Sequence, residues 1–261
     1  MKLGALWSDL LAAVEFLTRL PVPSRPYQDD SLVRSLKFFP LVGLFLGACA
    51  AAFDLLLAAH LPTLAVATFV IALLIVLTGG FHEDALADTA DGFGGGWNRE
   101  QILTILRDSR IGSYGGVALV LSLIARVVLL SSLPRVGVLP VLMTAHVLCR
   151  WTTLPLSYYL APARLDNATA ANGQGARGKG QGARVAGLTT TSTLVGGTLF
   201  SFACAAVLLR WQAVGAILIA ILVTLLSGLY YRRRIGGVTG DCFGATNQLT
   251  EIAVYLCGVW A

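Results

Sequence analysis

Long apolar stretches, most of them close to 20 residues, follow one another along this chain and leave little polar sequence between them. About 20 apolar residues are enough for a helix to cross the hydrocarbon core of a bilayer. Only 13% of the residues are charged, against roughly 25% in a typical soluble domain. The chain is therefore predicted to be an all-α, polytopic membrane protein, with residues 1–261 forming one membrane-embedded domain. Seven spans are expected, at 38–59, 63–80, 115–133, 138–160, 185–209, 213–231 and 242–260.

The basic residues of the connections predict how these spans are oriented. From the N-terminus onward the connections carry five, none, three, one, four, one and three Lys or Arg residues. Since cytoplasmic loops are enriched in Lys and Arg, this alternation predicts seven spans with the N-terminus and residues 81–114 in the cytoplasm. A re-entrant last segment fits the same counts. Residues 6–20, shorter and interrupted by charge, are expected to form an interfacial helix, and the Gly-rich 161–184 connection to be a flexible linker.

The most informative segment, residues 81–114, carries six of the 14 acidic residues and has a formal charge of −3. Asp84, Asp88 and Asp91 follow an i, i+4, i+7 spacing, so a helix continuing out of the second span presents them on one face. Like charges at a membrane edge need a positive partner. Mg²⁺ typically binds through one or two carboxylates together with substrate phosphates. A Mg²⁺ site is therefore predicted here, with Glu83 as a further candidate ligand off that face; ion pairs with neighbouring arginines are the alternative.

The residues that follow this helix add groups suited to phosphate chemistry. Glycines at 92 and 94–96 are expected to end the helix and to let backbone amides approach a ligand. In the next motif, DSRIG at 108–112, the Arg110 guanidinium matches the geometry of phosphate oxygens. Asp108 is a candidate metal ligand or general base, and helix capping is its alternative role.

A second polar segment, residues 232–251, enters the last apolar stretch. Asp241, Asn247 and Glu251 are costly there, which makes them candidates for function. Asn247 and Glu251 are four residues apart and share a helix face. Arg232, the first of three arginines, is a candidate for substrate binding or simply a topology signal.

Taken together, these motifs resemble cobalamin synthase, the membrane-bound adenosylcobinamide-GDP ribazoletransferase family. The matching elements occur in the family's order over essentially the whole chain, and the 79–92 run is the most specific of them. The family usually has Asp-Gly where this chain has Asp84 and Ala85, and its loop pattern is blurred at 161–184. The matching elements are FLTRLPVP at 16–23, FFPLVGL at 38–44, GGFHEDALADTADG at 79–92, DSRIG at 108–112, and GDCFGA at 240–245 with Glu251.

The resemblance implies a late step of cobalamin biosynthesis. The family joins adenosylcobinamide-GDP to α-ribazole or its 5′-phosphate, gives adenosylcobalamin or its phosphate, releases GMP and requires Mg²⁺. A ribose hydroxyl attacks the cobinamide-side phosphorus of a pyrophosphate, so carboxylate-held Mg²⁺ and arginines would stabilise the charge that develops.

Each candidate residue receives a role on this interpretation. The catalytic candidates are Asp108, Asp241 and Arg110. The metal candidates are Glu83, Asp84, Asp88 and Asp91. The candidates for substrate binding are His82, Arg110, Asn247, Glu251 and Arg232. The expected partners are the two substrates and the lipid bilayer; no nucleic acid is expected, and the sequence permits a homo-oligomer without indicating one.

Two other classes of protein were weighed. The start of the CDP-alcohol phosphotransferase motif is echoed by Asp88 and Asp91, but its continuation is absent. A cation transporter would use charged groups inside the spans, of which Asp54, Arg126, His146 and Arg150 are examples. Against a transporter, the acidic residues concentrate in one connection and no inverted repeat is evident.

Overall fold

The computed structural model describes residues 2–23, 30–163 and 186–260. This part of the chain is almost entirely helical and holds no strand, only an isolated bridge between Pro162 and Val238. The all-α prediction is confirmed, while nearly all of the predicted 161–184 linker lies outside the described residues. In chain order the helices are α1 (Lys2–Leu17), α2 (Ser31–Ser35), η1 (Leu36–Phe38), α3 (Phe39–Leu57), α4 (Thr63–Thr78), α5 (Phe81–Gly95), α6 (Arg99–Ile105), α7 (Ser113–Ser132), α8 (Arg135–Trp151), α9 (Thr153–Tyr159), α10 (Thr191–Leu209), η4 (Arg210–Gln212), α11 (Ala213–Ile235) and α12 (Gly240–Trp260).

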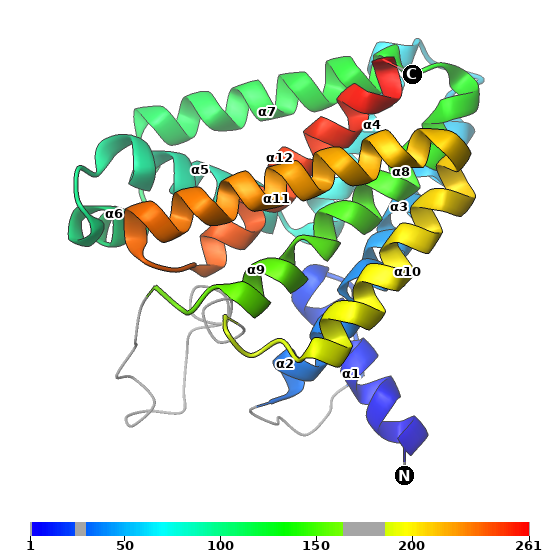
Figure 1. Cartoon of the computed structure of the whole chain (residues 1–261). Coiled ribbons are helices and arrows are strands. Elements are labelled where there is room, and N and C mark those ends of the chain that lie inside the picture. Colours follow the sequence, from blue (N-terminus) through cyan, green and yellow to red (C-terminus); the bar gives the residue numbers. More distant parts are fainter. Residues whose placement is uncertain (1, 24–29, 164–185, 261) are drawn as a thin grey trace.

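Several of these helices are suited to cross a membrane, which confirms the polytopic prediction. Within the described ranges, four helical stretches are long and apolar enough: Ser31–Leu57, Ser113–Ser132, Arg135–Tyr159 and Thr191–Ile235. The last of these contains α10 and α11, which change direction at η4 (Figure 1). A fifth span results if α4 and α5 are counted together. The number of seven spans stays a prediction, since α12 is not among these stretches.

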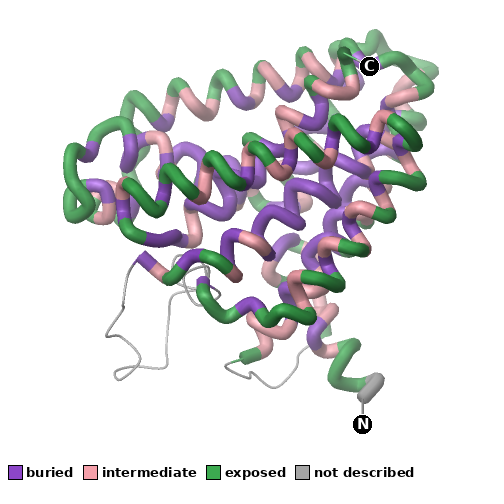
Figure 2. Tube along the Cα trace, in the orientation of Figure 1, coloured by how far each residue is buried: buried purple, intermediate pink, exposed green. Residues whose placement is uncertain are grey.

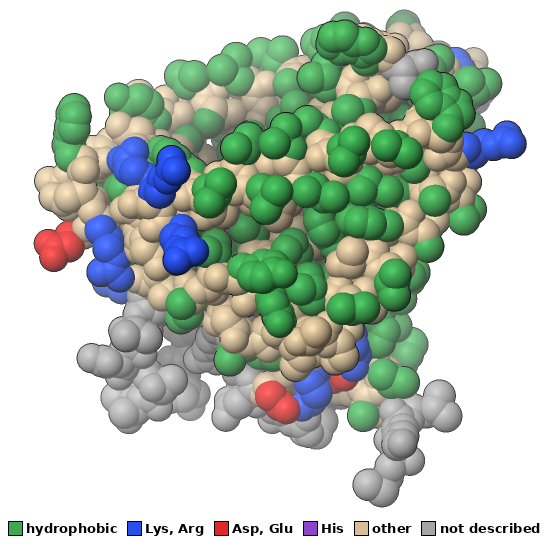
Figure 3. Space-filling view, viewed as in Figure 1, with side chains coloured by type: hydrophobic (Ala, Val, Ile, Leu, Met, Phe, Trp, Pro, Cys, Tyr) green, Lys and Arg blue, Asp and Glu red, His purple; other side chains and the backbone are tan. Residues whose placement is uncertain are grey.

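A broad apolar surface covers α10 and α11, as expected for helices that face lipid (Figure 3). Basic side chains gather instead at the end where α6 and the last turn of α11 lie. Large exposed apolar patches mark surfaces that contact a membrane or a partner. The exposed apolar side chains of these two helices include Leu199, Val207, Val214, Leu218, Leu222, Leu225 and Leu229.

The connections between helices lie at two ends of the molecule (Figure 1). The α3–α4 connection, the α7–α8 turn and η4 lie at the same end as the C-terminus, whereas α6 and the α11–α12 turn lie at the opposite end. The connections with few Lys and Arg residues therefore lie at one end, and the Arg-rich connections lie at the other, as the alternation of basic residues predicts. The acidic segment and the three arginines of α11 therefore share one end.

The centre of the molecule is the contact between α3 and α8, where buried residues concentrate (Figure 2). Gly43 and Gly47 lie one turn apart on α3, and the backbone of α8 at His146 and Met143 occupies the space that their side chains would fill. Small residues at this spacing let two membrane helices approach closely. α8 is consequently held against α3 over its buried, polar half.

The chain bends by 89° between α4 and α5, at Gly79 and Gly80. Both glycines have left-handed backbone angles, with φ of 72° and 68°, a region that other residues rarely adopt. The backbone amide of Arg19 donates to Leu77 O at 2.7 Å beside the bend, and the Arg19 side chain lies over Gly79. The prediction that α5 continues out of the second span was wrong, because these two glycines redirect the chain.

The N-terminal helix α1 is anchored to the body by a buried carboxylate. Asp9 accepts hydrogen bonds from Arg34 Nε at 3.0 Å and from Lys37 Nζ at 2.9 Å. Nearer its end, Phe16 stacks on Phe39 with ring centroids 5.6 Å apart. The helix predicted at residues 6–20 is confirmed in position, although its place at the interface stays a prediction.

Candidate active site

Helix α5 carries the predicted metal ligands, but they lie in different surroundings. Asp84 is exposed and Asp88 is half-buried, whereas Asp91 and Glu83 are buried. Since α5 is helical from Phe81 to Gly95, the predicted i, i+4 pair of Asp84 and Asp88 shares one face. These two side chains are the members of the set that remain closest to solvent.

Asp91 caps the N-terminus of α7. Its two carboxylate oxygens accept hydrogen bonds from the backbone amides of Gly112, at 2.7 Å, and Gly115, at 2.8 Å. The first amides of a helix lack intrahelical partners and carry partial positive charge, so they stabilise a carboxylate placed there. A side chain at Gly112 or Gly115 would occupy the same space as this carboxylate. The positive partner that we expected for Asp91 is therefore supplied by the backbone amides of α7. The role of Asp91 as a metal ligand stays a prediction.

The glycine-rich end of α5 confirms one part of the prediction and contradicts another. The helix passes through Gly92 and ends at Gly95, with Gly96 extended, so it ends within the predicted glycines. Gly92 is covered by Leu106, and Gly96 by Ile102 of α6, so neither position is an open approach to a ligand. These glycines instead allow α6 to fold back tightly on α5.

Asp108 and Arg110 form an exposed pair just before α7. Arg110 Nη2 donates to Asp108 Oδ2 at 2.6 Å, and the Arg110 backbone amide donates to Asp108 Oδ1 at 3.0 Å. The hydrogen bond that Arg110 donates to Asp108 raises the pKa of Arg110, so the guanidinium stays charged at any physiological pH. The Arg110 side chain is 87% exposed, which leaves it accessible to an incoming phosphate.

Helix α12 brings the second polar segment against α5. Gly244 of α12 packs directly on Ala85 of α5, the residue after Asp84. Asp241 lies one turn before Gly244 and is half-buried, and its Oδ2 lies 3.4 Å from Thr239 Oγ1. This contact therefore brings the end of α12 that bears Asp241 to the part of α5 that bears Asp84. Arg232, by contrast, is exposed on the last turn of α11.

Glu83 belongs to a buried ionic cluster inside the helix bundle. Arg126 of α7 is 1% exposed; its Nη2 donates to Glu83 Oε1 at 2.8 Å, and its Nη1 lies 3.5 Å from Glu251 Oε1. Gln248 Nε2 donates to the same Glu83 oxygen at 3.2 Å. One arginine thus joins α5, α7 and α12. A Glu83 that is neutralised in this way has less charge to offer a metal.

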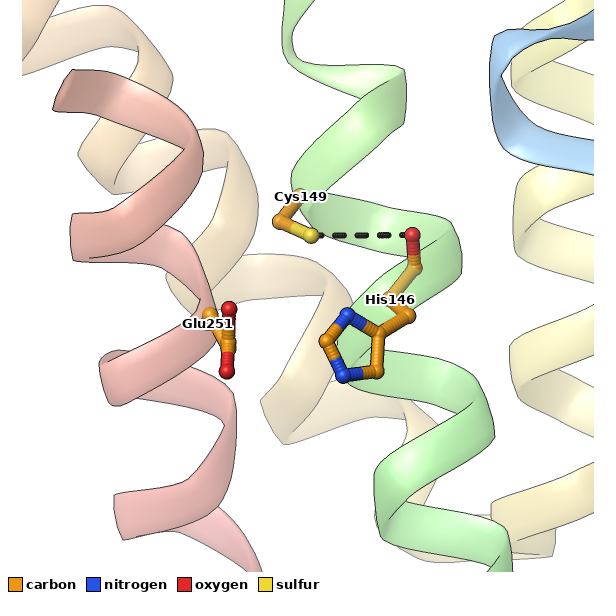
Figure 4. Close-up of side chains that lie close together, drawn as sticks. All are labelled: His146, Cys149 and Glu251. Carbon is orange, nitrogen blue, oxygen red and sulfur yellow. Dashed lines mark hydrogen bonds between the residues drawn. The ribbon is translucent and has the colours of Figure 1, made fainter. Parts of the chain in front are cut away.

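His146 and Cys149 of α8 lie beside Glu251 of α12, with candidate ligand atoms within 4.8 Å of one another (Figure 4). They form the one group of metal-ligand type found in the described part of the chain. Arg150 Nη1, however, contacts His146 Nδ1 at 2.6 Å and Cys149 Sγ at 2.9 Å. A guanidinium on both donor atoms excludes a cation from them, so the group is a polar network rather than a metal centre.

Several arginines have structural roles that the sequence did not indicate. Arg99 donates to Ile235 O at 2.8 Å and to Ala163 O at 2.7 Å, and Arg234 donates to Gly96 O at 2.9 Å. Both satisfy carbonyl oxygens at helix ends, where intrahelical donors are missing. The alternative that Arg99 neutralises the acidic residues of its segment is therefore not supported by these contacts. Their sequence separation of 136 and 138 residues left no local signal.

The charged groups that favoured a transporter are paired within the structure. Asp54 accepts a hydrogen bond from Arg135 Nη2 at 2.6 Å, and Arg126 lies between two glutamates. Such pairing stabilises the helix bundle without a transported ion.

The donor set on α5 suits a hard divalent cation. Asp84 and Asp88 offer carboxylate oxygens on one face, and Asp84 is exposed enough for phosphate oxygens and water to complete an octahedral shell. Asp91 and Glu83 already accept hydrogen bonds, so they fit such a site less well.

Comparisons with known proteins point in one direction. The sequence profile of the cobalamin-5-phosphate synthase family matches residues 9–259. The adenosylcobinamide-GDP ribazoletransferase of Azorhizobium caulinodans is 42% identical, over 99% of this chain and 97% of its own length. The proteins of the same name from Sinorhizobium medicae and Vibrio cholerae are 40% and 37% identical, over 97% and 94% of this chain and 96% and 91% of their own lengths. No solved structure matches the chain significantly.

Proposed function

The chain belongs to the cobalamin-5-phosphate synthase family, and on that premise we propose that it is an adenosylcobinamide-GDP ribazoletransferase. It would transfer the adenosylcobinamide phosphoryl group from adenosylcobinamide-GDP to α-ribazole or α-ribazole 5′-phosphate. The products would be adenosylcobalamin or its 5′-phosphate, and GMP. The observation that carries this proposal is the packing of Gly244 on Ala85, which joins the part of α12 that follows Asp241 to the part of α5 that bears Asp84. The hydrogen bond from the Gly112 amide to Asp91 joins the segment that bears Arg110 to the same helix.

The reaction breaks a phosphoanhydride bond and forms a phosphate ester bond. The oxygen of a ribazole ribose hydroxyl forms a bond to the cobinamide-side phosphorus, the bridging P–O bond of the pyrophosphate breaks, and GMP leaves with that oxygen. The hydroxyl proton passes to a carboxylate. Asp241 and Asp108 are the candidates for this base: Asp241 is half-buried in the first turn of α12, and Asp108 is paired with Arg110.

Charge on the phosphoryl group must be balanced while these bonds exchange. Arg110 and Arg232 are both exposed at the end of the molecule that carries the acidic segment, and a guanidinium fork matches phosphate oxygens. Bound Mg²⁺ would supply Lewis-acid stabilisation of the pyrophosphate and the leaving phosphate. Asp84 and Asp88 would hold it. Asp91 and Glu83 would keep α5 in position through their hydrogen bonds to α7. We also propose that this end faces the cytoplasm of the bacterial inner membrane, in keeping with its content of basic residues.

The activity is tested directly with purified protein in liposomes. The protein should convert adenosylcobinamide-GDP and α-ribazole to adenosylcobalamin with one GMP released for each product, only when Mg²⁺ is present. Cation flux across the liposome without GMP release would instead support a transporter. GMP release without adenosylcobalamin would mean hydrolysis rather than transfer.

A further inference from the structure

An aromatic pocket lies where α1, α3, α5, α9 and α12 meet. We define this aromatic pocket by four rings and two polar side chains: Phe16, Phe39, Phe81, Phe243, His82 and Asn247. Four separate sequence motifs, each far from the others along the chain, contribute to it. Its lining also includes Gly240, the neighbour of Asp241, so the pocket borders the proposed catalytic carboxylates.

The rings of the pocket contact one another in stacked and edge-to-face pairs. Phe16 stacks on Phe39 at 5.6 Å and meets Phe81 edge to face at 5.4 Å, and Phe81 meets His82 at 5.3 Å. Offset and edge-to-face contacts of this kind are the favourable geometries for aromatic groups. A planar heteroaromatic ring would form the same contacts.

The polar side chains of the pocket point to a ligand with little hydrogen-bonding capacity. Asn247 is 3% exposed, and its Oδ1 finds no hydrogen-bond partner anywhere in the described ranges. A buried polar atom without a partner is costly, and a ligand commonly explains it. His82, also 3% exposed, adds a ring nitrogen beside it. The unpaired Oδ1 can only accept a hydrogen bond, so it needs a donor such as a ribose hydroxyl, while the mostly apolar lining suits an aromatic base.

We propose that the aromatic pocket binds the benzimidazole base of the ribazole substrate. This inference rests on the proposed function and deepens it, because it names the part of the protein that holds one of the two substrates. The guanine base of the other substrate is the competing occupant. Guanine has several donors and acceptors along its edge, which this apolar lining would leave unpaired at considerable cost. The dimethyl-substituted edge of the ribazole base has none.

The pocket is narrow in this structure and must widen for the base. Its free volume is about 20 Å³, enough for one water molecule. Phe39 and Phe243 are buried, but Phe16 and Phe81 are only half-buried. The base therefore enters by displacing the Phe16 and Phe81 rings and stacking in their place, against Phe39 and Phe243. A ribose hydroxyl then donates to Asn247 Oδ1, and Asn247 Nδ2 donates to the free ring nitrogen of the base.

Steady-state kinetics of the full chain in liposomes test this assignment. Phe243→Leu keeps the apolar volume but removes a ring, and should raise KM for α-ribazole by about 5- to 150-fold, the range that stacking on an aromatic ring contributes. Asn247→Leu should raise the same KM by about 10-fold, through loss of a hydrogen bond to the bound base. KM for adenosylcobinamide-GDP should stay unchanged in both. Phe202→Leu is the matched control, since Phe202 packs on Trp151 away from the pocket.

Equilibrium binding of radiolabelled α-ribazole, without chemistry, separates the two proposals. If the wild-type chain binds α-ribazole and both pocket variants bind it at least 5-fold more weakly, the pocket assignment is supported even for a variant that has lost turnover. Unchanged binding in both variants, or displacement of the bound α-ribazole by guanosine, overturns it. Wild-type protein that transfers no corrinoid to α-ribazole refutes the proposed function instead.

Discussion

Replacing Arg126 by leucine tests how the buried ionic cluster holds the helices together. The arginine side chain is 1% exposed, and it stands between Glu83 at 2.8 Å and Glu251 at 3.5 Å. Arg126→Leu leaves two carboxylates in the apolar interior without a counter-charge. Removal of one partner from a buried ion pair typically costs about 3–5 kcal/mol. The free energy of unfolding should fall by about that amount.

Denaturant unfolding in detergent, followed by tryptophan fluorescence, measures this loss. The triple variant Arg126→Met, Glu83→Gln, Glu251→Gln removes all three charges at similar volume and should recover most of the stability, because neutral replacement of a whole cluster is often tolerated. Arg233→Leu, a change of the same kind at an exposed position, should leave unfolding unchanged. An Arg126→Leu loss below about 1 kcal/mol, the range of surface pairs, would refute the reasoning.

Two glycine contacts give further predictions with built-in controls. Gly115→Ala should cost about 1–3 kcal/mol by overpacking against Asp91, whereas Gly116→Ala, which meets open space, should change little; equal unfolding midpoints for the two variants would contradict the capping contact. Gly43→Ala should disrupt the α3–α8 contact to a similar or larger extent, while Gly196→Ala serves as its control. Loss of folded protein on size-exclusion chromatography only in Gly43→Ala is the expected result, and similar yields would contradict the close packing.

A prediction about metals follows from Arg150. Because its guanidinium contacts both His146 and Cys149, zinc should not stabilise the protein against thermal unfolding. Mg²⁺ together with substrate should do so, since a ligand that binds only the folded state raises stability. Stabilisation by zinc that disappears in Cys149→Ser would overturn the interpretation of this group as a polar network.

The sequence predicted the helical class and the helix positions well, because the period and length of apolar stretches are local properties. It also predicted that α5 is a helix with Asp84 and Asp88 on one face. The direction of α5 was wrong, since the 89° bend depends on two consecutive left-handed glycines. Apolar content alone does not reveal such a bend.

The partners of the buried charges were beyond the sequence. Arg126 and Glu83 are 43 residues apart, and no local pattern in either segment predicts that they pair. Asp91 shares its helix face with Asp84 and Asp88 in projection, yet it faces the amides of Gly112 and Gly115 because α7 packs on α5. Tertiary packing, rather than spacing, therefore decides which carboxylates remain accessible to a metal and a phosphate.

The central claim is that the solvent-accessible carboxylates of α5 hold the metal for phosphoryl transfer. The most direct measurement is the rate of GMP release at saturating substrates over a Mg²⁺ titration, for the wild type, Asp84→Asn, Asp88→Asn and Glu100→Gln. We predict that each α5 variant loses about 100-fold or more, as expected when a metal site is disrupted. Glu100→Gln, an exposed acid of the same segment, should keep wild-type rates. Wild-type rates and Mg²⁺ dependence in both Asp84→Asn and Asp88→Asn would contradict the account.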